Sequence, residues 1–464
     1  MQVNEPNEFP VLASVDVLIA GGGVGGIAAA LASARAGAKT MLIERSSYTG
    51  GVATACLVTQ VLNCYYTADH RLAITGIPLE IADALAEAEG YGKKWHDHKG
   101  HILYDVESAK LVFDRLLTEA GVTVQYNTVV SGVVKNADTL SGLIIESASG
   151  REVILAKTVI DATGDAAVAL HAGVPVHAVM PWGRHSFCFR FGNVEIADFV
   201  AYLEKHPGEY PDYLDVNWTA AEALASYRAL GTFMYPHASF IELSAMKRAI
   251  ALGDFKKTSG VYDSLEHCQL IGVKRNKSVC IIPGMTDLPR GVNAGDISHA
   301  ITDGRTMAKQ VAELFNKYIP GFEHAYVSQT ADYPGIRGSR WIDGDFVFTN
   351  AMRETNSAFD DRIARSVVQL NTVKGKYAVM DFTNGIFDIP YRTLMPRGMD
   401  GLIMGSGRTV SVEHPFLLRL MPVAMAIGQA AGTAAAVAAK TGKTARTVNV
   451  SEVQSILKQQ GVSI

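Results

Sequence analysis

The feature of this sequence that most constrains its fold is a glycine-rich turn between an apolar strand and a helix of small residues. The apolar run at residues 15–20 stops abruptly at Gly21, as expected of a strand buried on both faces of a parallel sheet. Gly21, Gly23 and Gly26 have the spacing Gly-x-Gly-x-x-Gly. These glycines permit a tight turn, the approach of a pyrophosphate, and close packing of a helix predicted at 27–36. The amides that begin this helix would face the phosphates.

A second strand and an acidic residue complete this unit. Gly37 favours the end of the helix, residues 39–43 are typical of a strand, and Glu44 follows at the distance where a carboxylate accepts hydrogen bonds from ribose hydroxyls. A glycine triplet alone is weak evidence, because such turns are common without a ligand. Here strand, helix and acidic residue coincide, so we predict a dinucleotide site. These residues alone do not distinguish NAD from FAD as the dinucleotide.

Length and charge limit the classes of protein. A chain of 464 residues exceeds one ordinary core, so two or more domains are expected. The net charge of −4 and the lack of a long basic run argue against nucleic acid as a partner and favour a small-molecule substrate, with a homo-oligomer left open. The first ten residues do not resemble a signal peptide, so we expect a cytoplasmic protein. The small-apolar stretch at 421–439, interrupted by Pro422, predicts a buried helix and no membrane insertion.

The cysteines do not form a recognisable pattern. They are five in number and scattered, without a Cys-x-x-Cys pair. Neither a disulfide framework nor an iron–sulfur site is indicated. Cys56 and Cys64 are a remote alternative as a redox pair, but buried or unreactive thiols are the more common use of such residues.

The signals typical of a nucleotide-binding domain lie at both ends of the chain. A helix is expected at 106–120, and strands and turns between 122 and 160 predict a small β-meander. The middle differs, with aromatic-rich strands and helices near 241–251 and 298–318, and strand character returns at 402–404. We therefore predict a nucleotide-binding domain formed by residues 1–172 and 390–464, with a substrate domain at 173–389 inserted in it.

Five ordered motifs carry a family resemblance. Besides Gly21–Gly26 with Glu44 and Arg45, they are Gly50-Gly51-Val52-Ala53-Thr54, Ala162-Thr163-Gly164-Asp165, residues 389–396 with Gly405-Ser406-Gly407-Arg408, and Arg419-Leu420-Met421-Pro422 running into 428–432. The chain resembles the FAD-dependent oxidoreductases of the glutathione-reductase-type Rossmann class. The resemblance implies an α/β fold: a Rossmann-like FAD-binding domain, with a parallel sheet and a small β-meander, and an interleaved α+β substrate domain.

The resemblance also implies which residues contact FAD. Thr128 and Val130 are similar to the stretch that meets the adenine, the loop at 162–165 to the second FAD loop, and the loop at 405–408 to the one near the ribityl chain and pyrophosphate. A helix starting near Met421 would direct its amides at the pyrimidine edge of the flavin, where negative charge develops on reduction. The implied cofactor residues are Gly21, Gly23, Val24, Gly25, Gly26, Glu44, Arg45, Gly50, Gly51, Val52, Ala53, Thr54, Val130, Ala162, Thr163, Gly164, Asp165, Gly407, Arg408, Leu420 and Met421.

Few side chains are needed for chemistry, because a flavin itself accepts the hydride. His414 follows the loop at 405–408 and precedes the helix predicted to start near Met421, so we expect it close to the flavin. A histidine there can take or give a proton near neutral pH. Arg340 and Arg419, with Arg337, offer planar forks for an acidic substrate. A structural histidine, and arginines that bind cofactor phosphates or nearby aspartates, are the alternatives.

A metal site is not expected. His96, His98 and His101 suggest zinc ligands, but their charged and glycine-rich surroundings favour an exposed loop. A second Gly-x-Gly-x-x-Gly unit is not evident either, which argues against a domain for NAD(P)H. Electrons would then leave to oxygen, a quinone or a protein carrier.

The sequence therefore predicts an FAD-dependent dehydrogenase or oxidase that moves hydride from a small organic substrate to flavin N5, with His414 as the base. Two alternatives remain: a flavin-dependent reductase of activated C=C bonds, and an FAD-carrying subunit that transfers electrons for a partner protein.

Overall fold

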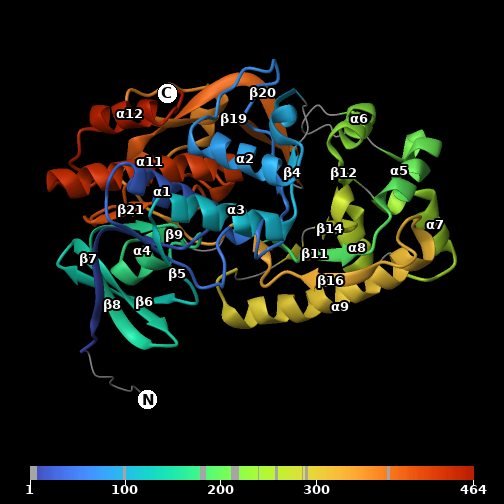
Figure 1. The fold of residues 1–464 in the computed structure, drawn as a ribbon, viewed down its shortest axis with the longest axis horizontal. Helices are drawn as coiled ribbons and strands as arrows, with labels where there is room; N and C mark the ends of the chain where they lie inside the picture. The colour runs from blue at the N-terminus through green and yellow to red at the C-terminus, as the bar shows by residue number, and fades with distance from the viewer. Residues whose placement is uncertain are drawn as a thin grey trace.

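The structure is a computed structural model, which describes residues 8–97, 101–177, 184–210, 219–238, 240–256, 260–284, 286–287, 291–373 and 377–464. Two lobes lie side by side in Figure 1. The first combines both ends of the chain, drawn in blue to teal and in orange to red, and the second is built mostly from the middle, in green and yellow. The chain thus leaves the first lobe and returns to it.

One sheet forms the centre of the first lobe. Its strands have the order β5–β2–β1–β8–β7–β6, with β21 paired to β8. They are β1 (Val11–Ala20), β2 (Thr40–Ile43), β5 (Thr123–Gln125), β6 (Val129–Asn136), β7 (Thr139–Ser147), β8 (Gly150–Asp161) and β21 (Leu402–Met404). Strands β5, β2, β1, β8 and β21 pair in parallel, whereas β6, β7 and the start of β8 form an antiparallel meander. The predicted parallel sheet with a small β-meander is confirmed.

The register of this sheet brings the predicted motifs together. Ala20 pairs with Ile43 on one side and with Asp161 on the other, and Asp161 pairs with Met404. The four strands therefore end side by side, although they come from opposite ends of the chain. Each glycine- or acid-containing loop begins at the next residue, so the loops share one edge of the sheet, where α/β folds bind ligands.

Two helices of small residues pack against each other in this lobe. They are α1 (Val24–Arg35) and α11 (Met421–Thr441). A Cβ atom added to Gly428 would lie 2.0 Å from the carbonyl oxygen of Gly25, and one added to Gly432 would lie 2.1 Å from that of Ala29. The two backbones approach this closely only because these positions lack side chains.

Helix α11 has the length and apolar composition of a membrane-spanning helix. Among the described residues it is the one helix that is long and apolar enough to cross a membrane. However, 94% of its most apolar 18-residue stretch is buried inside the protein. Pro422 and the glycines do not interrupt this helix, which runs from Met421 to Thr441. The predicted burial is confirmed, and a core helix passes the same length and hydropathy test.

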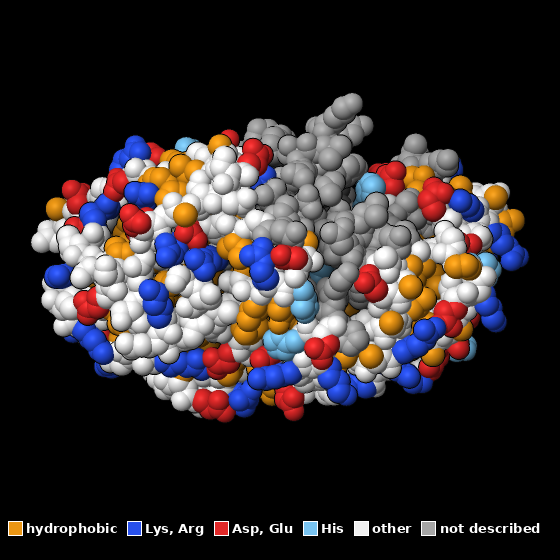
Figure 2. Space-filling view, turned by 90° about the horizontal axis from the view of Figure 1, so that it is seen from above, with side chains coloured by type: hydrophobic (Ala, Val, Ile, Leu, Met, Phe, Trp, Pro, Cys, Tyr) orange, Lys and Arg blue, Asp and Glu red, His pale blue; other side chains and the backbone are white. Residues whose placement is uncertain are grey.

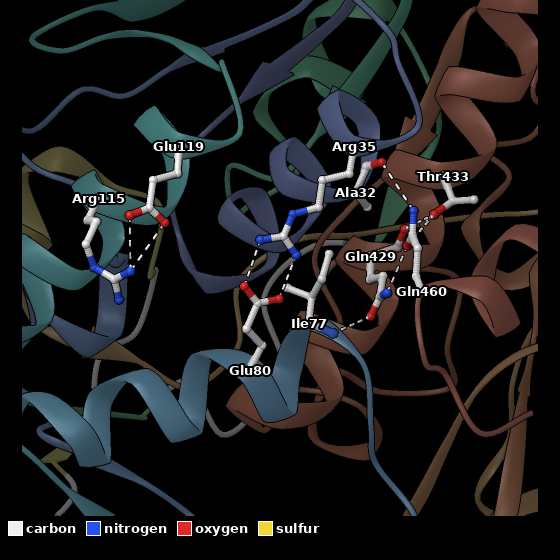
Figure 3. A network of polar contacts seen from close by, with 9 residues as sticks. All are labelled: Ala32, Arg35, Ile77, Glu80, Arg115, Glu119, Gln429, Thr433 and Gln460. Carbon is white, nitrogen blue, oxygen red and sulfur yellow. Dashed lines mark hydrogen bonds and ion pairs between the residues drawn. The ribbon is translucent and has the colours of Figure 1, made fainter. Parts of the chain in front are cut away.

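Buried polar groups connect the helices of the first lobe. Gln429 in α11 accepts a hydrogen bond from the amide of Ile77 at 3.0 Å and donates one to Gln460 at 2.9 Å (Figure 3). Since Ile77 begins α2 (Ile77–Ala88), Gln429 caps a neighbouring helix whose own N-cap residue, Gly76, has no side chain. Arg35 and Glu80 form a two-bond ion pair beside this network.

An antiparallel sheet forms the second lobe. Its order is β12–β13–β14–β11–β16, that is β12 (Thr232–Ala238), β13 (Cys268–Val273), β14 (Ser278–Ile282), β11 (Phe189–Gly192) and β16 (Tyr326–Thr330). The long helix α9 (Ala294–Tyr318) runs along this lobe (Figure 1). Aromatic rings fill its core; for example, the ring centroids of Phe191 and Phe315 are 5.7 Å apart. The expected α+β character is confirmed.

The remaining helices and strands surround these two sheets. They are α3 (Val106–Glu119), α4 (Ala167–Ala172), α5 (Ile196–Lys205), α6 (Ala220–Leu230), α7 (Ser244–Ala251), α8 (Gly260–Glu266), α10 (Asn350–Glu354), α12 (Val450–Gln459), β3 (Gln60–Val61), β4 (Ile102–Leu103), β9 (Val176–His177), β10 (Arg184–Ser186), β15 (Thr286–Asp287), β17 (Gly335–Ile336), β18 (Trp341–Ile342), β19 (Arg362–Val373) and β20 (Tyr377–Pro390).

The two lobes are joined by polar contacts, while charge is mixed on the surface. Arg190 of the second lobe donates to Asp105, which caps α3, at 2.9 Å. On the face shown in Figure 2, basic and acidic side chains are mixed, without a large area of either sign among the coloured residues.

The domain division at 172/173 and 389/390 stays a prediction. Three residues of the predicted substrate domain, Trp341, Phe348 and Phe387, pack in the core of the first lobe.

The boundaries of two elements differ from those expected. Helix α1 begins at Val24 instead of residue 27, because Gly25 and Gly26 are themselves helical. Residues 150–161 form one continuous strand, β8, where the sequence pattern favours two short strands at 153–156 and 158–160. In both cases tertiary packing outweighs local sequence preference, since β8 is paired along its length with β1.

Candidate functional site

The turn after β1 forms the base of the candidate site. Gly21 has a φ of +97°, and a Cβ there would lie 2.7 Å from the carbonyl oxygen of Ala162. A Cβ at Gly26 would lie 1.9 Å from the carbonyl oxygen of Gly21, so the helix packs tightly on the turn. At Gly23 an added Cβ would meet nothing within 4 Å, and this residue is the N-cap of α1 without a side-chain cap. The start of α1 therefore presents open backbone to an anion.

Glu44 lies at the end of β2, buried next to this turn. Its carboxylate accepts hydrogen bonds from the amides of Gly22 at 2.7 Å and Ser46 at 2.8 Å. The carbonyl oxygen of Glu44 accepts from the amide of Thr128 at 3.0 Å. Val130, two residues on, is half-buried in β6 and pairs with Ile145. The predicted ribose and adenine segments are thus neighbours.

The Gly50–Gly51 turn packs directly on the first glycine loop. The amide of Gly50 donates to the carbonyl oxygen of Gly22 at 2.7 Å, and a Cβ at Gly51 would lie 3.0 Å from the Cα of Gly23. Val52 is half-buried, whereas Ala53 and Thr54 are buried beneath the turn. Gly50, Gly51 and Val52 therefore border the open backbone, and Ala53 and Thr54 support it.

The loop after β8 is shaped by a buried carboxylate. Asp161 accepts hydrogen bonds from the amide and hydroxyl of Thr163 and from the amide of Ala169. Burial raises the pKa of Asp161, although these hydrogen bonds oppose the shift. The carbonyl oxygen of Asp165 accepts from Nε of Arg340 at 2.9 Å. This contact places Arg340 on the backbone of the predicted cofactor loop.

The loop after β21 closes the site from the other side. A Cβ at Gly25 would lie 2.4 Å from the carbonyl oxygen of Gly405, and one at Gly407 would lie 2.1 Å from that of Leu418. Arg408 donates to the carbonyl oxygens of Gly164 and Ile336. Its hydrogen bonds in the structure thus hold three loops together, and its predicted role in cofactor binding stays a prediction.

The start of α11 lies next to the start of α1. Leu420 is the N-cap of α11 without a side-chain cap, Met421 is its first residue and Pro422 follows. A Cβ at Gly25 would lie 3.2 Å from the carbonyl oxygen of Ala424, in the first turn of α11. Two helix N-termini, each with a positive dipole end, therefore converge at this edge of the sheet.

His414 and Arg419 occupy the segment that leads into α11. Nδ1 of His414 and Nε of Arg419 are buried without a hydrogen-bond partner among the described residues. Burial lowers the pKa of His414 below 6.5; Glu413 opposes this shift and Arg353 adds to it. The Arg419 guanidinium lies over the ring of Phe416, 4.8 Å from its centroid. A histidine with a ring nitrogen unpaired among the described residues and a half-buried cation thus lie near each other.

Arg45 adds a contact that the sequence does not reveal. Its guanidinium lies over the ring of Tyr333, 4.4 Å from the centroid. Tyr333 comes from the middle of the chain, next to Asp332, which accepts a hydrogen bond from Tyr48. No motif marks residues 332–333, so only the fold identifies them as neighbours of the cofactor segment.

Neither of the two described histidines in this segment lies on an exposed loop, so for His96 and His101 that expectation is wrong. His96 lies in the 3₁₀-helix Gly92–Asp97 and contacts Asp83 at 2.8 Å and Tyr66 at 2.6 Å. His101 is buried and accepts from the amide of Asn63 at 3.0 Å. Helix α2 partly covers His96 through its contact with Asp83, while His98 lies outside the described residues. In the part of the chain that is described, no three His, Cys, Asp or Glu side chains group as metal ligands.

All five cysteines are free and buried, which confirms the expectation of buried thiols. Burial raises the pKa of Cys56 to about 12 and also raises that of Cys64. Since a thiolate is the reactive form, neither residue has the properties of a redox cysteine.

Comparison with known proteins agrees with this geometry. A family model described as FAD dependent oxidoreductase matches residues 16–457. A search of curated proteins finds no match.

Solved structures with a similar fold have low sequence identity. L-proline dehydrogenase from P. horikoshii is 11% identical, with 97% of this chain and 99% of that chain covered and a TM-score of 0.43. A geranylgeranyl bacteriochlorophyll reductase-like protein from Thermoplasma acidophilum is 14% identical, with 97% and 82% covered and a TM-score of 0.42. THI4 from Thermovibrio ammonificans is 26% identical over 36% of this chain and 66% of that one, with a TM-score of 0.27. Scores this low carry no information about the substrate.

Proposed function

Because the chain belongs to the FAD-dependent oxidoreductase family, we propose that this enzyme oxidises a small organic substrate by removing hydride from a C–H bond, with His414 as the proton acceptor. FAD is the cofactor of the family, and oxidoreduction is its activity. The finer statement, that a small organic substrate is oxidised with His414 as the proton acceptor, rests on the geometry around the start of α11.

The described residues fit an extended dinucleotide. The open backbone at Gly23 and the uncapped start of α1 suit a pyrophosphate, because backbone amides and the helix dipole favour negative charge there. Glu44 is placed to accept from ribose hydroxyls, and the loops at 50–52 and 162–165 border the same edge. Bound FAD would supply the hydride acceptor, and the start of α11 would stabilise negative charge placed against it.

The half-buried His414 is the observation that carries the proposal. A histidine must be neutral to accept a proton, and the lowered pKa keeps His414 neutral at pH 7. Its Nδ1 has no partner among the described residues, so it has a position for a proton from a substrate O–H or N–H group. Arg353 and Glu413 are the charged groups that influence it.

A turnover screen tests this function. The FAD-loaded enzyme is assayed with an artificial electron acceptor against amines, alcohols and hydroxy acids, and turnover is expected with one of these classes. If no class turns over, and prereduced enzyme is reoxidised by an enoate but not by oxygen, the reaction runs in the reductive direction and the proposal is wrong.

The pH dependence of kcat/KM tests the role of His414. Because its pKa lies below 6.5, the base is already neutral at pH 7, and kcat/KM should be level there. As the pH falls through the lowered pKa, His414 becomes protonated and kcat/KM should drop. An acidic limb with its midpoint above 6.5 would contradict this assignment.

Replacing Glu44 tests the cofactor site. In Glu44→Gln an amide nitrogen replaces one acceptor oxygen, so either the amide of Gly22 or that of Ser46 loses its partner, as does a ribose hydroxyl. We expect FAD to bind about tenfold more weakly, measured by titration of the apoprotein. Glu146→Gln, on the exposed meander strand β7, is the matched control and should bind FAD normally. Unchanged affinity in Glu44→Gln would argue against the site.

A further inference from the structure

Within the described part of the chain, Arg419 is a cation without a counter-ion. Its Nε is buried without a hydrogen-bond partner, and no carboxylate of the described residues lies within ion-pair distance of its guanidinium. The ring of Phe416 covers one face of the guanidinium, which leaves the hydrogen-bonding edge for other groups. An arginine in such surroundings is stabilised when an anion binds to it.

Two further arginines, Arg337 and Arg408, add positive charge around Arg419. Burial, reinforced by the positive charges of Arg337 and Arg408, lowers the pKa of Arg419 to about 9, so it still carries its charge at neutral pH. Arg408 is engaged with backbone carbonyl oxygens, one of them that of Ile336. It thereby fixes the backbone from which Arg337 extends, and Arg337 contacts Ser186 at 3.4 Å. The local excess of positive charge favours an anion.

The cation and the proposed base lie at the two ends of one short segment. The ring centroid of Phe416 is 6.3 Å from that of His414 and 4.8 Å from Cζ of Arg419. The cofactor phosphates, by contrast, have their own place at Gly23 and the start of α1. A ligand held by Arg419 would therefore lie near His414.

We propose that Arg419, with Arg337 beside it, binds the carboxylate of the substrate, so that the enzyme acts on small organic acids. The planar guanidinium fork matches the two oxygens of a carboxylate. Binding would orient the acid with its reacting carbon toward His414. The position of the reacting carbon in this inference rests on the proposed function, whereas the binding of the carboxylate to Arg419 does not.

Carboxylate binding to the FAD-loaded enzyme tests the inference without turnover. Acetate and benzoate are titrated while the visible absorbance of the flavin is followed, with acetamide and benzamide as uncharged matches. Saturable changes are expected with the acids alone. In Arg419→Gln the dissociation constant for the acids should rise about tenfold or more, while FAD content per chain stays unchanged. Arg115→Gln, on the exposed face of α3, is the control.

Two results would overturn the inference. One is that neither acid binds to the wild-type enzyme. The other is that Arg419→Gln loses FAD while its remaining holoenzyme binds the acids normally, because Arg419 would then hold the cofactor phosphates. If Arg419→Gln does not fold, Arg419→Lys keeps the charge but loses the fork; severalfold weaker acid binding is expected, and unchanged binding overturns the inference. Failure of substrate oxidation is a separate result, since these titrations need no turnover.

Discussion

The Gly428→Ala variant is expected to lower the free energy of unfolding by about 3 kcal/mol and to weaken FAD binding. The new Cβ would lie 2.0 Å from the carbonyl oxygen of Gly25 and 2.8 Å from its carbonyl carbon. Both are backbone atoms of α1, so they cannot move aside as a flexible side chain would. Helices α1 and α11 must separate, and the start of α1 shifts away from the cofactor site.

Gly260→Ala is the matched control for this variant. Gly260 begins α8, and an added Cβ there meets nothing within 4 Å. It should be neutral or slightly stabilising, because alanine restricts the unfolded chain. Urea unfolding and FAD titration of both variants provide the measurement. Equal stability of the two would show that the close approach of α1 and α11 is not needed.

The His414→Asn variant is expected to reduce kcat by about 10²- to 10⁴-fold. Asparagine keeps a polar side chain of similar reach but cannot accept a proton near neutral pH. FAD content and unfolding should stay close to those of the wild type, because Nδ1 of His414 has no hydrogen-bond partner in the described structure. The acidic limb of the pH profile should also disappear.

His171→Asn is the control for the loss of a histidine. His171 is exposed in the last turn of α4, away from the start of α11. Its substitution should leave kcat unchanged. If His414→Asn turns over at the wild-type rate, His414 is structural and the base must be sought elsewhere.

The parts of the fold that follow from local patterns can be predicted from the sequence. The unit from β1 to β2 is recognisable because strand, glycine spacing, helix and acidic residue all lie within about thirty residues of one another. The helix from Met421 is recognisable for a similar reason, since most of its residues are small and apolar. The meander also follows from alternation and turn residues.

Contacts between distant segments cannot be predicted in the same way. The position of Tyr333 under Arg45 and the carbonyl partners of Arg408 depend on the return of the middle of the chain to the first lobe. The buried contact of His101 with the amide of Asn63 likewise joins segments that no motif connects.

Anaerobic mixing of the FAD-loaded enzyme with its substrate tests the central claim most directly. The visible absorbance of the flavin should bleach in a single turnover with a small organic acid, and much more slowly in His414→Asn. Reoxidation by an added acceptor should restore the absorbance. If no amine, alcohol or organic acid bleaches the flavin, the enzyme does not oxidise a small organic substrate and the proposed function is wrong.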